Sequence, residues 1–307
     1  MSLVYNIDMK KVVSLGIELD KDAKSRIEKR GGAVVSCDIP TSVDDLLEKT
    51  KDADVIYSDG DFLLESLSRL KNVFVTYPYI ELGEFDSAEL EKNGVYVANA
   101  RGGNKNSIVE WTVFMALALF RGFLNKVRIT ESVPFERLKS LEGKKVLIVG
   151  HGDIGSEIGK RLAEFGMKVN FYNRGDDLMQ KAKDADLVVN ALNVNVTDKN
   201  LLDKKFFADL KSGAYFISFS RLWTYDLDGL IAAINSGVVA GAAIDCDPEA
   251  SGDTENEFYQ KAFSNEKILV TPHIAFATDV ASQNGGEICV QNIEAWLSGK
   301  PVNIVKK

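Results

Sequence analysis

The chain has 307 residues, of which 45% are hydrophobic and 27% are charged, and its formal net charge is −8. This length predicts two domains, and this composition is typical of a globular protein with a sizeable core. The acidic balance argues against a general binder of nucleic-acid phosphates. The most apolar stretch, residues 113–120, is too short to span a bilayer, and the N-terminal segment lacks the pattern of an export signal.

The three cysteines, Cys37, Cys246 and Cys289, lie far apart in the sequence and form no Cys-x-x-Cys pair. Reduced thiols in a cytoplasmic protein explain this spacing better than a disulfide framework or a zinc site. We therefore expect a cytoplasmic protein with no metal site and no membrane contact.

Short apolar runs alternate with charged, helix-like stretches in the first third of the chain. The runs predicted as strands are residues 11–15, 33–37, 55–57, 73–76 and 95–98. The stretches predicted as helices are residues 21–30, 43–49, 63–70 and 87–93. Strict alternation of this kind predicts parallel strands joined by crossover helices.

A second alternating series begins after a long apolar helix, predicted over residues 107–120, and a polar stretch over residues 125–143. The series opens with a strand at 145–149, a helix at 156–165 and a strand at 167–172, and later strands are predicted at 214–219, 241–244 and 268–270. The sequence therefore predicts an α/β protein with two doubly wound Rossmann-like parallel-sheet domains and a cleft between them.

The turn between the strand at 145–149 and the following helix has the spacing of a dinucleotide-binding motif. Gly150 permits the tight turn, Gly152 lets the backbone approach a pyrophosphate, and Gly155 lets the helix pack on the strand. The free N–H groups at the start of the helix then face the phosphates. The cofactor contacts predicted in this turn are Gly150, His151, Gly152, Asp153, Ile154 and Gly155. His151 would flank the pyrophosphate as a tolerated loop residue.

The second strand of this unit ends in Asn173 and Arg174, where NAD-specific proteins of this fold have an acidic residue for the ribose. The missing carboxylate removes repulsion of a 2′-phosphate, and Arg174 is able to pair with that phosphate or stack on the adenine. We therefore favour NADP(H) over NAD(H), with NAD(H) remaining possible. The alternative is that Arg174 points into solvent and that cofactor choice is loose.

Charged residues follow three later strands of the same unit. Arg221 follows the strand at 214–219, Asp245 ends the strand at 241–244 with Glu249 shortly after it, and His273 follows the strand at 268–270. Ligands of open α/β sheets bind at these carboxyl ends. Taken singly, His273 would be read as a structural histidine and Arg221 as a surface ion-pair residue. As a set they supply what hydride transfer to a 2-keto acid requires.

The chain resembles the D-2-hydroxyacid dehydrogenase family over nearly all of its length beyond residue 70. The segments that carry this resemblance are residues 97–104, 107–110, 143–174, 192–221 and 292–303. The resemblance implies a substrate domain formed by residues 1–98 and 276–307 and a dinucleotide-binding domain formed by residues 99–275. It also implies a homodimer built through the dinucleotide-binding domains.

The resemblance assigns a role to each charged residue. Arg221 would bind the substrate carboxylate and polarise the C2 carbonyl, and His273 would donate and accept the proton at its oxygen. Glu249 would hydrogen-bond His273, and Asp245 would hold the nicotinamide carboxamide. Further cofactor contacts are expected at Leu192, Asn193 and Phe219.

Four features depart from the family pattern. Leu222 and Trp223 follow Arg221, where the family usually has glycine. The segment from Asp245 to Glu249 is one residue short, so Asp247 is a rival for the role of Glu249. Asn193 and Asn195 replace residues that are often Pro and Thr. The substrate loop is not glycine-rich: Pro78 lacks an N–H group, and Tyr77 and Tyr79 line the pocket or serve as packing aromatics.

The predicted function is hydride transfer between NADP(H) or NAD(H) and a small 2-keto or 2-hydroxy acid. The alternative is a nucleotide-binding sensor or interaction protein with little turnover on the same fold. A third reading is an enzyme of the same fold acting on formate or phosphite, and the carboxylate kept near His273 weighs against formate.

Overall fold

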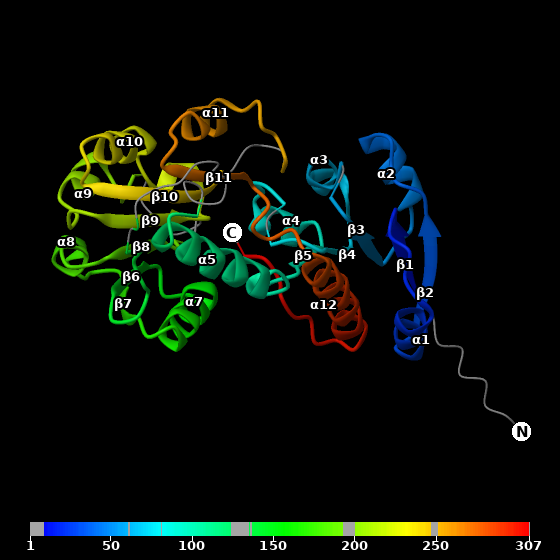
Figure 1. The fold of residues 1–307 in the computed structure, drawn as a ribbon. Helices are drawn as coiled ribbons and strands as arrows, with labels where there is room; N and C mark the ends of the chain where they lie inside the picture. Colours follow the sequence, from blue (N-terminus) through cyan, green and yellow to red (C-terminus); the bar gives the residue numbers. More distant parts are fainter. Residues whose placement is uncertain are drawn as a thin grey trace, which may run out of the picture. The chain divides into compact units, whose positions relative to one another are not determined.

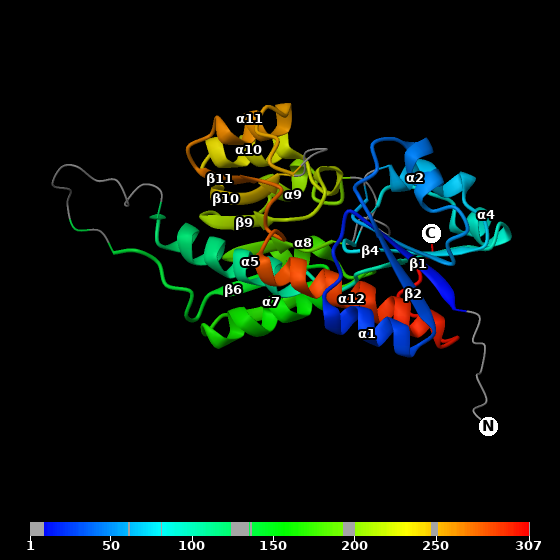
Figure 2. The same ribbon diagram turned by 90° about the vertical axis from the view of Figure 1, so that its right-hand side faces the viewer.

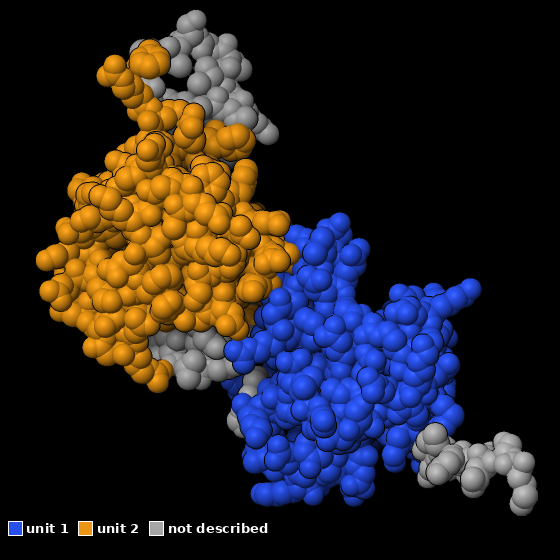
Figure 3. Space-filling model, turned by 90° about the horizontal axis from the view of Figure 1, so that it is seen from below, with its two compact units in different colours: residues 1–104, 278–307 blue, residues 105–277 orange. Residues whose placement is uncertain are grey.

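The computed structural model describes residues 9–60, 62–80, 82–123, 135, 137–192, 200–246 and 251–306. The chain divides into two compact units, which Figure 3 shows in different colours. Unit 1 contains Met1–Asn104 and Thr278–Lys307, and unit 2 contains Lys105–Ala277. The C-terminal segment therefore completes the unit in which the chain begins.

Unit 1 is built on a five-stranded parallel sheet in the order β2-β1-β3-β4-β5. Its strands are β1 (Lys10–Leu15), β2 (Gly32–Cys37), β3 (Val55–Ser58), β4 (Val73–Tyr77) and β5 (Val95–Asn99). Its helices are α1 (Lys21–Lys29), α2 (Val43–Lys49), α3 (Leu63–Ser66), α4 (Ser87–Lys92) and α12 (Asp279–Leu297). The strict alternation of the sequence thus gives parallel strands with crossover helices, as predicted.

Each face of this sheet carries its own apolar core. Helices α1 and α12 cover one face, and Figure 2 shows them side by side below the sheet. Trp296 of α12 stacks on Phe74 of β4 with a ring separation of 4.8 Å. Helices α2, α3 and α4 cover the other face. An N-terminal helix and the C-terminal helix therefore share one layer of unit 1.

Unit 2 is built on a six-stranded parallel sheet in the order β11-β10-β9-β8-β6-β7 (Figure 1). Its strands are β6 (Lys145–Val149), β7 (Lys168–Tyr172), β8 (Leu187–Asn190), β9 (Ala214–Ser218), β10 (Val239–Cys246) and β11 (Ile268–Pro272). Its helices are α5 (Lys105–Phe120), α7 (Asp153–Glu164), α8 (Leu178–Ala182), α9 (Lys204–Ala208), α10 (Leu227–Asn235) and α11 (Glu257–Phe263).

Alternate residues of each strand in unit 2 enter opposite cores. Val146 and Ile148 of β6 pack with α5 and α7, whereas Leu147 and Val149 pack with the helices α8 to α11. Both faces are apolar, which explains why β6 reads as an unbroken apolar run. The helix at Lys105–Phe120 is likewise apolar on most sides, as the sequence predicted.

Most helices in the described part of the chain begin at a residue whose side chain accepts a hydrogen bond from the first turn. In unit 2 these capping residues are Asp177, Asp203, Asp226 and Asn256. Helix α7 differs, because its N-cap residue is Gly152, which has no side chain to accept such a hydrogen bond. Its first backbone N–H groups are therefore left to another acceptor.

The structure confirms the predicted α/β class with two parallel sheets and corrects several element boundaries. Helix α7 begins at Asp153, not at residue 156, because Gly150 alone makes the left-handed turn, with φ of 113°. Asp245 lies within β10 and does not follow it. The predicted helix at 63–70 is a short α-helix followed by a 3-10 turn. The polar stretch at 125–143 lies mostly outside the described residues.

Candidate active site

The strand–turn–helix at β6–α7 leaves room for a ligand at one glycine and none at two others. A Cβ atom on Gly150 would clash with the carbonyl oxygen of Ala191, and one on Gly155 would clash with the carbonyl oxygen of Gly150. A Cβ atom on Gly152 would meet nothing within 4 Å. The first and third glycines are therefore needed by the protein's own packing, whereas Gly152 faces open space.

This turn lies at the point where the winding of the sheet reverses. The chain goes from β6 to β7 on one side and then returns to β8 on the other. Open α/β sheets bind ligands outside the carboxyl ends of the strands at such a point. The uncapped N–H groups of α7 and the positive end of its dipole suit an anion there. The residues present thus fit the pyrophosphate of a dinucleotide.

The side chain of His151, in the glycine turn, contacts the carboxyl end of β7. The imidazole stacks on Phe171 with a ring separation of 3.9 Å, and its Nδ1 lies 3.2 Å from Oδ1 of Asn173. The structure therefore brings two predicted cofactor residues, His151 and Asn173, together where the adenosine end of a dinucleotide would lie.

Asp176 places a carboxylate near the carboxyl end of β7. The sequence does not single it out, because it lies three residues beyond Asn173, where an acidic residue is expected. Its side chain accepts a hydrogen bond of 2.8 Å from the Asn173 N–H group and forms an ion pair of 2.8 Å with Lys181. The hydrogen bond from Lys181 is the largest cause that lowers the pKa of Asp176. The negative charge of Asp176 is therefore balanced within the protein.

Arg221 follows β9 on a backbone that is held on several sides. The Ser220 hydroxyl lies 3.1 Å from the carbonyl oxygens of Asn190 and Leu192. The Thr224 hydroxyl donates a 2.7 Å hydrogen bond to the Arg221 carbonyl. Leu192 is half-buried and packs against the core under helices α8 to α11. Phe219 packs against the core on the opposite face, under α5 and α7. The Arg221 guanidinium lies over the Trp223 ring.

His273 follows β11 in a left-handed backbone conformation, with φ of 53°. Asp245 fixes this turn: one carboxylate oxygen accepts from the Thr271 hydroxyl and the Ile274 N–H group at 2.9 Å, and the other accepts from the Ala275 N–H group at 2.8 Å. Burial raises the pKa of Asp245, whereas these hydrogen bonds and the charge of His273 act in the opposite direction. Asp245 therefore positions the backbone that carries His273.

The three strand ends lie next to one another, because β9, β10 and β11 are neighbours in the sheet. Asp245 is paired in register with Thr271 across β10 and β11, and Ile244 with Ser218 across β10 and β9. Arg221, Asp245 and His273 thus emerge at one edge of the sheet of unit 2. Glu249, its rival Asp247, and Asn193 lie outside the described residues.

The two tyrosines predicted to contact substrate lie in unit 1 and differ in exposure. Tyr77 is 1% exposed, packs in the core and donates a 3.2 Å hydrogen bond to the Ile80 carbonyl. Tyr79 is 47% exposed. The ring of Tyr79 is therefore the better placed of the two to contact a small molecule.

The described part of the chain contains no group of three His, Cys, Asp or Glu side chains suited to a metal ion. Among the helices of that same part, none combines the length and the apolar character needed to cross a membrane.

Fold and turn together define a dinucleotide-binding α/β protein, and comparison with known proteins names its family. Residues 113–275, which lie within unit 2, match the family model described as D-isomer specific 2-hydroxyacid dehydrogenase, NAD binding domain. The chain belongs to this family of oxidoreductases, which confirms the resemblance found in the sequence. It is thus a dehydrogenase that works with a nicotinamide dinucleotide.

Two relatives illustrate the range of similar enzymes. A D-lactate dehydrogenase of Staphylococcus aureus is 30% identical over 228 residues, covering 65% of this chain and 69% of its own length. A glyoxylate reductase of Thermococcus litoralis is 27% identical over 295 residues, covering 85% of this chain and 86% of its own.

Solved structures share the fold at lower identity. A D-isomer specific 2-hydroxyacid dehydrogenase of Lactobacillus delbrueckii ssp. bulgaricus, in an NAD complex, has a TM-score of 0.78 and 19% identity, covering 97% of this chain and 100% of its own. An acyclic imino acid reductase, in complex with NADPH and D-Arg, has a TM-score of 0.76 and 18% identity, covering 96% and 99%.

Proposed function

We propose that this chain transfers a hydride between NADP(H) or NAD(H) and a small 2-keto or 2-hydroxy acid. The observation that carries the proposal is that Arg221 and His273 follow β9 and β11, at the carboxyl edge of the sheet that also bears the β6–α7 glycine turn. The similarity to a D-lactate dehydrogenase and a glyoxylate reductase supports a small 2-keto acid as substrate.

In the proposed mechanism, Arg221 binds the substrate carboxylate with its planar fork and polarises the C2 carbonyl. His273 donates a proton to the carbonyl oxygen during reduction and removes the hydroxyl proton during oxidation. The glycine turn and the start of α7 would hold a nicotinamide dinucleotide, which would supply the hydride to C2 or accept it from C2. Asp245 keeps the turn that presents His273 in place.

Two further assignments complete the site. We assign to Glu249, with Asp247 as the alternative, the hydrogen bond that would fix the tautomer of His273. We assign Tyr79, whose ring is exposed, to the substrate contacts, and residues 1–98 and 276–307 to the substrate domain. Residues 99–275 form the dinucleotide-binding domain.

NADP(H) is the preferred cofactor in this proposal. Asn173 carries no charge at the end of β7, and the charge of Asp176 is balanced by Lys181. Arg174 then supplies the positive charge for a 2′-phosphate. We expect the KM for NADPH to lie below the KM for NADH. Arg174→Ala should raise the KM for NADPH about tenfold and leave the KM for NADH nearly unchanged. Equal KM values for the two cofactors in the native protein would overturn the preference.

We also propose that the enzyme works as a cytoplasmic homodimer. Phe114 of α5 and Phe123 are 55% and 45% exposed and pack edge to face, so unit 2 presents aromatic surface for a second copy. Light scattering should give twice the mass of the chain. Phe114→Glu should shift the protein toward monomer, and a monomeric native protein would end this part of the proposal.

The reaction is tested by the absorbance of NADPH and NADH at 340 nm with glyoxylate, hydroxypyruvate, pyruvate and aromatic 2-keto acids. We expect oxidation of the cofactor with at least one of these acids. His273→Ala should lower kcat by about 10²–10⁴-fold, whereas His151→Ala, the other histidine, should change mainly the KM of the cofactor. Cofactor binding without turnover across the panel would favour a sensor, and full activity of His273→Ala would refute the mechanism.

A further inference from the structure

The loop after Arg221 places an aromatic ring beside the guanidinium. Leu222–Thr224 forms a 3-10 turn, and Arg221 is the residue before it. The Arg221 Cζ atom lies 5.9 Å from the centroid of the Trp223 ring, and the indole remains 43% exposed. Trp223 is thus neither a core residue nor a free surface aromatic.

The backbone under both side chains is fixed by a buried polar frame. Asn190, which is fully buried at the end of β8, donates to the Thr224 hydroxyl at 2.9 Å and to the Ser218 hydroxyl at 3.2 Å. The Thr224 hydroxyl in turn donates to the Arg221 carbonyl. Unsatisfied buried amides are costly, so this frame resists rearrangement.

The carbonyl of Trp223 is held as well, because it accepts a 2.7 Å hydrogen bond from the Asn200 N–H group. These hydrogen bonds restrain the backbone of the turn at both ends, and this restraint keeps the indole near the guanidinium. A glycine in place of Leu222 would make this turn more flexible, because glycine has more conformational freedom.

A guanidinium over an indole is held by the ring's negative face and keeps its in-plane N–H groups for hydrogen bonds. An arginine side chain otherwise loses much rotational freedom when it binds a carboxylate. A partner that restrains the side chain beforehand lowers that cost and tightens substrate binding without entering the chemical step.

We propose that Trp223 is a positioning residue that holds Arg221 ready for the substrate carboxylate, and that its indole reports when that carboxylate is bound. This inference rests on the proposed role of Arg221. It assigns to Trp223 an effect on the KM of the 2-keto acid and none on proton or hydride transfer.

The first test compares steady-state constants of Trp223→Leu, Trp223→Phe and the native protein with the best 2-keto acid of the panel. Trp223→Leu should raise the KM of the keto acid about two- to fivefold, as an exposed cation–π contact implies, with kcat and the KM of the cofactor unchanged within twofold. Trp223→Phe should restore most of the loss, because it keeps an aromatic face. Phe258→Leu, a change at another exposed aromatic of unit 2, is the matched control and should have no effect.

The second test is spectroscopic and uses oxamate, a carboxylate that resembles a 2-keto acid, with cofactor present. Indole fluorescence should change on titration of the native protein and stay constant in Trp223→Phe. Equal KM values for Trp223→Leu and the native protein, or a loss confined to kcat, would overturn the positioning role. A fluorescence change that persists in Trp223→Phe would overturn the reporter role.

These outcomes are separable from failure of the proposed function. If oxamate raises the melting temperature and keto acids are reduced while Trp223 variants behave like the native protein, only the inference fails. If no acid is reduced and oxamate does not bind, Arg221 is not a carboxylate site, and the inference falls with the proposed function.

Discussion

In both units, the second strand lies on one side of the first, and the third, fourth and fifth strands follow on the other side. The helix after the first strand begins differently in the two. In unit 1, α1 begins at Asp20, whose carboxylate accepts a hydrogen bond from the Ala23 N–H group. In unit 2, the N-cap residue of α7 is Gly152, which provides no side-chain cap. A Cβ atom at Gly152 would meet nothing within 4 Å.

This difference shows what the shared winding supplies and what it leaves open. The winding supplies a helix N-terminus beside the carboxyl end of the first strand in each unit. The residue at the start of the helix then decides whether the N–H groups bind the chain's own carboxylate or remain for a phosphate. In unit 1 the N-cap side chain stabilises the helix start, whereas in unit 2 the first N–H groups of the helix remain available to a ligand.

The largest effect is expected from Gly155→Ala, because the added methyl group meets the Gly150 carbonyl oxygen. The turn must move, so the rise in melting temperature caused by NADPH should disappear, and overpacking should cost about 1–3 kcal/mol of stability. Gly286→Ala in α12 of unit 1 is the matched control, since its methyl group meets only the Tyr57 hydroxyl at 3.5 Å. A normal NADPH response in Gly155→Ala would show that the turn accommodates the methyl group without being displaced.

The comparison is sharpened by Gly152→Asp, which gives α7 the carboxylate cap that α1 has. The backbone at Gly152 has φ of −88°, which an aspartate adopts without strain. We expect an unchanged or slightly higher melting temperature and a Kd for NADPH at least about 100-fold weaker, because the new charge faces the phosphates. Calorimetric titration measures this. Gly152→Asn, without the charge, should bind more tightly than Gly152→Asp, and equal affinities would exclude charge as the cause.

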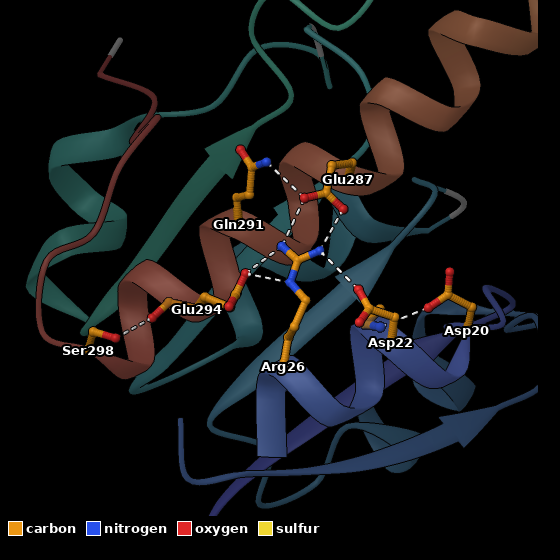
Figure 4. A network of polar contacts seen from close by, with 8 residues as sticks. Asp20, Asp22, Arg26, Glu287, Gln291, Glu294 and Ser298 are labelled. Atoms are coloured by element: carbon orange, nitrogen blue, oxygen red, sulfur yellow. Dashed lines mark hydrogen bonds and ion pairs between the residues drawn. The ribbon is translucent and has the colours of Figure 1, made fainter. Parts of the chain in front are cut away.

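In unit 1, a charge network joins helix α1 to helix α12. Arg26 of α1 donates to both carboxylate oxygens of Glu287 and to Glu294 of α12, and Figure 4 shows these contacts. Arg26→Met should lower the free energy of unfolding of unit 1 by about 1–2 kcal/mol, since a bidentate network exceeds a single surface pair. Chemical denaturation measures the change. Lys205→Met, which breaks the exposed Lys205–Asp209 pair in unit 2, should leave the free energy of unfolding nearly unchanged.

The network also predicts a pH dependence. The hydrogen bond from Arg26 holds the pKa of Glu287 below its usual value of 4.5. A carboxyl with a lowered folded-state pKa contributes stability that is present above the unfolded value and lost as pH falls through the folded value. The stability gap between the native protein and Arg26→Met should therefore be full above about pH 5 and narrow in more acidic buffer. A gap that does not depend on pH would assign the loss to packing.

The smallest effect is expected at the counterpart of Gly152. Asp20→Ala removes the cap of α1 and should cost about 1 kcal/mol of stability. It should not create a dinucleotide site in unit 1, because the only glycine of the β1–α1 turn, Gly16, packs against the Ile39 side chain and not against a backbone carbonyl oxygen. Hydrogen exchange at the start of α1 measures the local loss, and NADPH titration should still give one site per chain. A second site would contradict the comparison.

Local sequence patterns are enough to predict the two alternating series, the glycine turn and the residues at the ends of β9, β10 and β11. These features are local: a buried strand is an unbroken apolar run, a helix ends at glycine, and a motif has fixed spacing. Membership of the dehydrogenase family followed from the same motifs. The start of α7 was placed three residues late, because nothing in the local sequence shows that Gly152 already caps the helix.

The side-chain contacts of the site depend on the tertiary fold and are not predicted by the local sequence. Asn190 reaches Thr224, His151 reaches Asn173, Arg26 reaches Glu287, and Asp245 holds the turn of His273. Each partner is distant in sequence, so the meeting depends on strand order and helix placement, which periodicity does not encode. Tyr77 and Tyr79 make the same point: they are two residues apart in one segment, yet the core buries the first and leaves the second exposed.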